Sequence, residues 1–347
     1  MRILSLAGAL LLATSTYALA GNQTTDHSHH HNHHASGHDH SARIHAPIGI
    51  MGDHLHDKGD WMFSYRYMNM EMDGNRDGNR ELTPAETRAE GFMVAPLNMT
   101  MEMHMFGVMY GLTEDLTVMA MAPYVIKEMD HETGALVHFT TETEGISDVK
   151  VSGIYGLSKQ GDEEVLLNFG VSLPTGSISE RGDTPMGSNQ KLPYPMQLGS
   201  GTVDPTLGIT YTNVTNNVSW GGQANTTLRF GENDEDYRLG NEYNATAWVA
   251  TKFTDWVHGS LRIKAAVWGD IQGSDPQLNP AVVPTARADL RGGERVETLI
   301  GFSIADPSGA WSGHRLALEA GLPVYQNLDG PQMQTDYTFN IGWQYAF

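Results

Sequence analysis

The sequence predicts an all-β protein: an antiparallel transmembrane β-barrel of about 12 strands, with both termini periplasmic and a disordered His-rich N-terminal arm. In the C-terminal stretch DYTFNIGWQYAF, every second residue is large and apolar, and the residues between are small or polar. Such a strand offers one face to lipid and the other to a polar lumen. Beyond residue 20, no stretch approaches the roughly eighteen apolar residues of a membrane-spanning helix. A closed barrel is then the remaining way to satisfy a backbone in lipid.

The first 20 residues have the form of a signal peptide. Arg2 supplies a positive charge, ILSLAGALLLAT forms an apolar run, and Ala18–Ala20 is an A-x-A cleavage site, so the mature chain is expected to begin near Gly21. The chain contains no Cys, which excludes disulfides. Any metal chemistry must therefore use His, Met and carboxylates.

Residues 21–43 are predicted to form a disordered periplasmic arm, because they are polar and of low complexity. Imidazole suits copper, zinc and nickel, so one interpretation is a flexible metal scavenger. The alternative is a polar linker whose metal affinity is incidental. The candidate metal ligands in the arm are His29, His30, His31, His33, His34, His38 and His40.

Residues 44–60 are predicted to be ordered, as a plug of the periplasmic end or as a metal-binding segment. Met51, His54, His56 and Met62 bring two imidazoles and two thioethers into one short stretch. Thioether sulfur is a soft ligand that suits Cu(I) and Ag(I). The alternative is a turn whose histidines are solvated or hydrogen-bonded.

Residues 61–347 are predicted to form the barrel. Short turns such as GLTEDL and SKQGDE alternate with longer loops rich in Gly, Pro, Asp and Glu, as periplasmic turns and extracellular loops do. An even number of strands places both termini in the periplasm. We expect strands near 61–72, 97–111, 116–127, 145–157, 164–175, 203–213, 218–230, 238–252, 256–271, 294–304, 314–325 and 334–347.

The first strand is expected to turn its aromatic residues, from Trp61 to Tyr67, toward lipid. Its alternate positions, Met62, Met68, Met70 and Met72, then face the lumen or its rim. Such a row beside the paired histidines would suit the passage of a soft metal ion.

The second strand, NMTMEMHMFGVMYG, carries conflicting signals. If Met99 to Met105 face lipid, Glu102 and His104 point into the lumen, where His104 is a further candidate metal ligand, but Phe106 then lies on the wrong face. We expect a β-bulge near Phe106 or Gly107 to reconcile the two halves. Without a bulge, the methionines face the lumen and Glu102 and His104 face lipid.

The charge of the chain excludes one class of partner. Removal of the signal peptide takes away Arg2, so the mature chain has 20 basic and 41 acidic residues. Its formal charge is therefore −21. A chain so acidic is not a nucleic-acid binder. The expected partners are outer-membrane lipid, the machinery that inserts barrels and reads the C-terminal strand ending at Phe347, and metal ions or a small-molecule substrate.

Several stretches, among them HMFGVMYGLTEDLTVMAMAPY, GISDVKVSGIYGL and GSGTVDPTLGITYT, resemble a family of bacterial outer-membrane β-barrel transporters. That family is related to the MetA-pathway of phenol degradation barrels, and the resemblance covers most of residues 45–347. It implies passage of a small molecule across the outer membrane, and its label points to a hydrophobic aromatic substrate.

These observations favour an outer-membrane channel that handles copper or a similar soft metal through the His arm and the Met/His-rich first hairpin. The alternative is a channel for small hydrophobic or aromatic compounds. We do not expect an enzyme, because His104, His258 and His314 lack a local catalytic signature.

Overall fold

The computed structural model describes residues 44–215, 217–305 and 311–347. Its contacts divide the chain into residues 1–38 and 39–347, and all of the described residues belong to the second unit. The helices in these ranges lack the length and the apolar character that a membrane-spanning helix needs.

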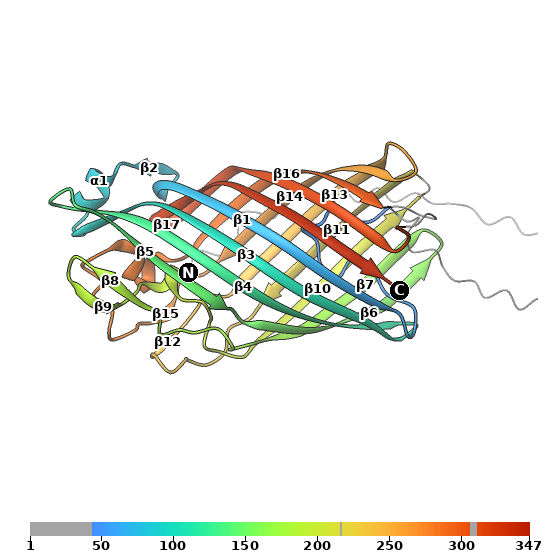
Figure 1. Cartoon of the computed structure of the whole chain (residues 1–347), viewed down its shortest axis with the longest axis horizontal. Helices are drawn as coiled ribbons and strands as arrows, with labels where there is room; N and C mark the ends of the chain where they lie inside the picture. The colour runs from blue at the N-terminus through green and yellow to red at the C-terminus, as the bar shows by residue number, and fades with distance from the viewer. Residues whose placement is uncertain (1–43, 216, 306–310) are drawn as a thin grey trace, which may run out of the picture. The chain divides into compact units, whose positions relative to one another are not determined.

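A closed antiparallel barrel forms the second unit (Figure 1). Neighbouring strands pair in the order β17-β16-β14-β13-β11-β10-β7-β6-β4-β3-β1, and β1 pairs back to β17. Their bounds are β1 Trp61–Gly78, β3 Val94–Thr113, β4 Leu116–Thr133, β6 Val149–Gln160, β7 Glu163–Leu173, β10 Asp204–Val214, β11 Val218–Thr227, β13 Glu242–Lys252, β14 Val257–Trp268, β16 Gly293–Ala305 and β17 His314–Ala346.

The long element β17 crosses the wall twice. Its residues 315–328 pair with β16, and residues 328–346 pair with β1. Leu328 lies opposite both Gly293 and Gly78, and Gly330 has the positive φ of a tight turn. The eleven strand elements therefore make twelve passes through the wall, the number that the sequence predicts.

The smaller elements gather at one end of the barrel, which we call the loop end, and the C-terminus lies at the other, the turn end (Figure 1). The helix α1 begins with a capping box, because Thr83 and Glu86 each bond the other's backbone N–H. The bounds of these elements are β2 Arg80–Leu82, α1 Pro84–Ala89, β5 His138–Ile146, β8 Arg181–Thr184, β9 Gly187–Lys191, η2 Tyr194–Met196, β12 Tyr237–Arg238, β15 Gln272–Gly273, η3 Pro284–Ala286 and η4 Ala288–Leu290.

The distribution of apolar and polar residues in the wall is the reverse of that in a soluble protein. Large apolar residues such as Phe63, Ile300 and Leu316 are about half exposed on the outside. Charged residues such as Arg262 and Glu319 are buried within the lumen. Along each strand, apolar residues that face outward alternate with polar residues that face inward. This arrangement suits a wall between lipid and a polar interior. The predicted all-β transmembrane barrel is confirmed.

The predicted bulge near Phe106 or Gly107 is wrong. β3 pairs with β1 and β4 without a register shift from Asn98 to Tyr110. Met99 and Met109 are buried, whereas Phe106 is 58% exposed, so the methionines face the lumen. Glu102 and His104 face outward. Tyrosines on the neighbouring strand reduce the free-energy cost of turning a polar side chain toward lipid, because Tyr65 Oη lies 2.8 Å from His104 Nδ1.

Candidate functional site

Residues 44–60, which we call the inner segment, lie inside the barrel and are held by side chains of its wall. Arg315 Nη2 donates to the carbonyl of Ala46 over 2.7 Å, and Gln223 Nε2 donates to that of Met51 over 2.8 Å. The N–H of His56 donates to Thr117 Oγ1 over 2.8 Å. These three bonds come from β17, β11 and β4, so the segment is tied to well-separated parts of the wall.

Two glycines allow the inner segment to fit. Gly52 has a φ of +70°, which disfavours a side chain, and a Cβ there would overlap the amide oxygen of Asn168. A Cβ on Gly49 would collide with the ion pair of Arg262 and Glu319, which is buried and doubly hydrogen-bonded at 2.8 and 2.5 Å. The backbone can approach the lumen charges this closely only because these positions lack side chains.

Methionines cover one side of the lumen along neighbouring strands. Met62 pairs with Met109, and Met99 lies between Met72 and Met129, so thioethers stand side by side across β1, β3 and β4. We call this surface the methionine wall; it comprises Met62, Met68, Met70, Met72, Met99, Met101, Met103, Met105, Met109, Met119, Met121 and Met129. Toward the loop end, Met99 and Met129 pack with the loop residues Leu192 and Met196.

A small cavity lies between the inner segment and the methionine wall. Its volume of about 10 Å³ is close to that of a single water-sized particle. Asp53 and His54 line it, together with the thioether residues Met51, Met62, Met105, Met109, Met119 and Met121. Several soft ligands thus surround a space of ionic dimensions, and the Arg66 side chain also lines it.

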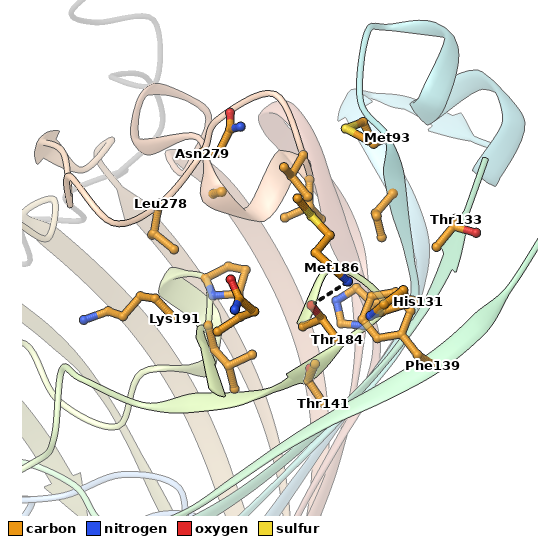
Figure 2. Close-up of a pocket in the computed structure, with 18 of the residues that line it drawn as sticks. Met93, His131, Thr133, Phe139, Thr141, Thr184, Met186, Lys191, Leu278 and Asn279 are labelled. Atoms are coloured by element: carbon orange, nitrogen blue, oxygen red, sulfur yellow. Dashed lines mark hydrogen bonds between the residues drawn. The ribbon is translucent and has the colours of Figure 1, made fainter. Parts of the chain in front are cut away.

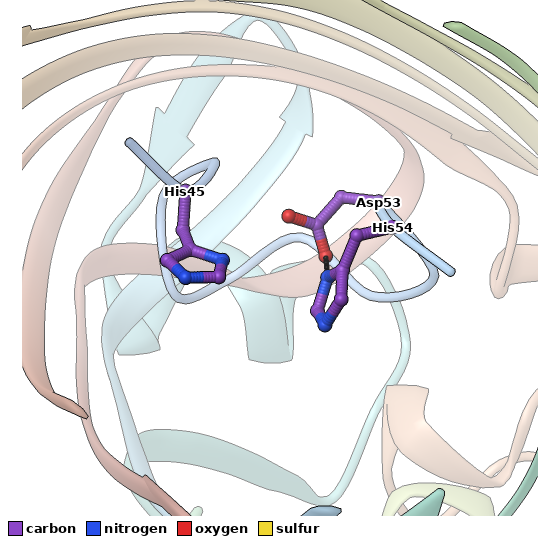
Figure 3. Close-up of side chains that lie close together, drawn as sticks. All are labelled: His45, Asp53 and His54. Atoms are coloured by element: carbon purple, nitrogen blue, oxygen red, sulfur yellow. Dashed lines mark hydrogen bonds and ion pairs between the residues drawn. The ribbon is translucent and has the colours of Figure 1, made fainter. Parts of the chain in front are cut away.

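His45, Asp53 and His54 form a cluster within the inner segment (Figure 3). One ligand atom from each lies within 4.8 Å of the others, and His54 Nδ1 is 2.9 Å from Asp53 Oδ1. Burial alone would raise the pKa of Asp53, but the neighbouring His54, His45 and Arg315 outweigh it and hold that pKa well below its usual range. Two imidazoles and a carboxylate can together hold a transition-metal ion.

A second, apolar cavity of about 540 Å³ lies among the loops of the loop end (Figure 2). Val94, Val283 and Ala286 form its buried apolar part, beside Phe139 and Leu278. The ring of His131 stacks on Phe139 with centroids 4.7 Å apart. The size and lining of this cavity suit a small hydrophobic molecule.

The sequence-predicted metal residues separate into three groups. Those of the arm, from His29 to His40, lie outside the described residues. Met51, His54 and Met62 come together at the small cavity, and the ring of His56 lies 4.9 Å from that of His54. Met68 and Met70 lie farther along the methionine wall.

His104 does not join these residues. It faces outward, whereas the expectation placed it in the lumen, because no bulge changes the face of its strand. Sequence reasoning also missed His45, Asp53 and the lumen charges Arg262, Arg315 and Glu319. No local motif marks them, because their proximity depends on how the inner segment folds.

The three histidines considered for catalysis lie on different strands. His104 contacts Tyr65, and His314 Nδ1 accepts a hydrogen bond from Trp343 Nε1 over 3.2 Å. His258 lies inside the barrel beside Arg315. The partners of these histidines thus do not suggest a common catalytic arrangement.

A family model described as "Putative MetA-pathway of phenol degradation" matches residues 89–282. A search among curated proteins gave no match. The structure is similar to that of an outer membrane channel from Pseudomonas putida, with a TM-score of 0.59 and 12% identity, over 85% of this chain and 98% of that chain. The translocator domain of the autotransporter NalP from Neisseria meningitidis gives a TM-score of 0.44 and 10% identity, over 85% of this chain and 91% of that chain. The first likeness shows that this chain has the fold of an outer-membrane barrel.

Proposed function

The chain belongs to the family described as "Putative MetA-pathway of phenol degradation", and from this premise we propose that it is a channel of the Gram-negative outer membrane. The signal peptide directs it out of the cytoplasm, and lipid surrounds its apolar outer surface. The insertion machinery reads the C-terminal strand that ends at Phe347. We further propose that the turn end faces the periplasm and that the N-terminal arm acts in that compartment.

The inner segment acts as a plug that closes the channel. The observation that supports this role is its attachment to the wall by Arg315, Gln223 and Thr117. Planar-bilayer recording tests it. The full-length protein should remain closed most of the time, and a variant lacking residues 21–60 should conduct continuously. A full-length protein with a steady open conductance would contradict the plug.

The cargo that the geometry favours is a soft monovalent ion such as Cu(I). The observation that carries this assignment is the methionine wall, together with the ion-sized cavity beside His54. Thioethers bind Cu(I) and Ag(I) well and bind harder cations weakly, and their lack of charge lets an ion leave again. The periplasmic His arm would collect copper near the channel.

Titration with Ag(I), a redox-stable analogue of Cu(I), tests the cargo. A triple variant, M105L, M109L and M121L, keeps the side-chain volume and removes three sulfur atoms, so each substitution should cost less than about 1.5 kcal/mol of stability. We expect this variant to bind fewer Ag(I) ions than the parent. Met93→Leu is the matched control, because Met93 is 58% exposed at the loop end and lies outside the methionine wall. Equal Ag(I) binding by the triple variant and the control would contradict the assignment.

A second candidate cargo is a small hydrophobic compound. The apolar loop-end cavity favours it, because a ring-sized molecule can enter there before reaching the lumen. Toluene binding tests this candidate. Val283→Trp places an indole in the buried part of the cavity and should weaken binding, whereas Ala281→Trp, at an exposed position of the same loop, should preserve it. Absence of toluene binding by the parent protein would remove this candidate.

A further inference from the structure

His45, Asp53 and His54 come from opposite ends of a loop within the inner segment. The chain turns between them, and the glycines at 49 and 52 allow the loop to lie against the wall. The rings of His45 and His54 meet edge to face, with centroids 5.4 Å apart. Figure 3 shows the Asp53 carboxylate beside both rings. A shared ligand at this point would therefore join the two ends of the loop.

The donor set differs from that of the methionine wall. Two imidazole nitrogens and one carboxylate oxygen are borderline and hard ligands, which suit Zn(II), Cu(II) and Ni(II). Asp53 Oδ1 contacts His54 Nδ1 and orients the imidazole, as carboxylates do in many metal sites, so His54 Nε2 and the second carboxylate oxygen of Asp53 are the donors offered to the ion.

We propose that His45, Asp53 and His54 bind one divalent transition-metal ion and that the bound ion fastens the inner segment in the lumen. This inference rests on the proposed role of the segment as a plug. The site exists only while the loop is folded, so the metal binds the closed channel better than the open one. A metal concentration one hundred times the dissociation constant then shifts the closed-to-open ratio about a hundredfold.

The surrounding charges make Asp53 the decisive ligand. The guanidinium of Arg315 is fixed close by, donating to the Ala46 carbonyl and to Gln344 Oε1 over 3.0 Å, and it opposes any cation. The Asp53 carboxylate supplies the negative charge of the cluster. Asp53→Asn keeps the shape of the side chain and should abolish binding, even though both imidazoles remain.

The first experiment measures binding of Zn(II) and Cu(II) to the full mature protein by titration. The arm remains in every variant, so differences between variants report the cluster alone. We expect His45→Gln and Asp53→Asn each to lose one bound ion, and the Cu(II) electron paramagnetic resonance signal should lose its matching nitrogen couplings in His45→Gln. His138→Gln is the control, because His138 is exposed at the loop end.

The second experiment measures the lifetime of the closed state in bilayers with and without Zn(II). Zinc should lengthen it in the parent and in His138→Gln, but not in Asp53→Asn. Equal ion stoichiometry in all variants would overturn the site, and an unchanged lifetime in the zinc-loaded parent would overturn the fastening. The ion stoichiometry at saturating metal is measured without any conductance reading, so a parent that conducts steadily without metal refutes the plug while leaving the site to be judged by binding.

Discussion

Gly52→Ala should open the channel by unseating the inner segment, without disturbing the barrel. An L-residue in the left-handed region costs about 1–2 kcal/mol, and Gly52 has a φ of +70°. The new Cβ would also displace the Asn168 side chain, whose amide donates to Thr210 Oγ1 over 2.7 Å. The loss of that hydrogen bond adds about 1 kcal/mol. The total of about 2–3 kcal/mol would raise the open-to-closed ratio roughly 30- to 150-fold.

Single-channel open probability in planar bilayers measures this effect. Asn168→Ala removes the atom that the new Cβ would meet, so the double variant with Gly52→Ala should be less open than the two single effects combined. Heat-modified mobility in detergent gels checks that each barrel is folded. If Gly52→Ala opens no more often than the parent, or if the two effects simply add, Gly52 does not hold the inner segment against Asn168.

Three further predictions concern the lumen charges and the loop end. Glu319→Gln leaves the buried guanidinium of Arg262 without its ionic partner, so the free energy of unfolding should fall by about 3–5 kcal/mol; a loss below 1 kcal/mol in urea titration would contradict this. Glu235 accepts a hydrogen bond from the buried Lys191, which holds the pKa of that carboxyl below its ordinary value of 4.5. Its stabilisation is therefore fully present above pH 4.5 and is lost as the pH falls through the lowered pKa. Limited proteolysis should cut the loop faster only in that acid range. Faster cleavage already at pH 6 would contradict the role of the Glu235–Lys191 pair. Met196→Ala empties a fully buried position beneath the loops and should cost about 2–5 kcal/mol; unchanged thermal unfolding would show that the loop is not seated there.

The sequence predicted the barrel because its signals are local and repeated. The alternation that ends at Phe347 continues through the wall, and short turns separate strand-length segments. The predicted segments 314–325 and 334–347 correspond to the two passes of β17. The strand β5, which pairs with the loop-end half of β4, was not predicted, because its polar, Thr- and Glu-rich sequence has the composition of a loop.

The face of the methionines could not be predicted from one strand alone. If Glu102 and His104 face the lumen, the methionines face lipid. If Phe106 faces lipid, the methionines face the lumen, and the sequence favours neither choice clearly. The structure decides between them through neighbouring residues: Tyr65 contacts His104, and Met62 stands opposite Met109. Such pairings depend on strand register, which a single sequence does not specify for a strand with two mixed faces.

The His45, Asp53 and His54 cluster was out of reach for a different reason. The sequence places His54 in a candidate site, but His45 joins it only through the path of the backbone past Gly49 and Gly52. That path is set by the wall residues Arg262 and Asn168, which are distant in sequence.

Passage of soft metal ions along the methionine wall can be measured as the flux of Ag(I) through proteoliposomes containing the variant that lacks residues 21–60. Its M105L, M109L and M121L derivative has the same lumen volume with three fewer thioethers, and potassium flux serves as the internal reference. We expect Ag(I) flux to fall in the derivative while potassium flux is unchanged. Equal Ag(I) flux through both proteins would contradict passage of soft metal along the methionine wall.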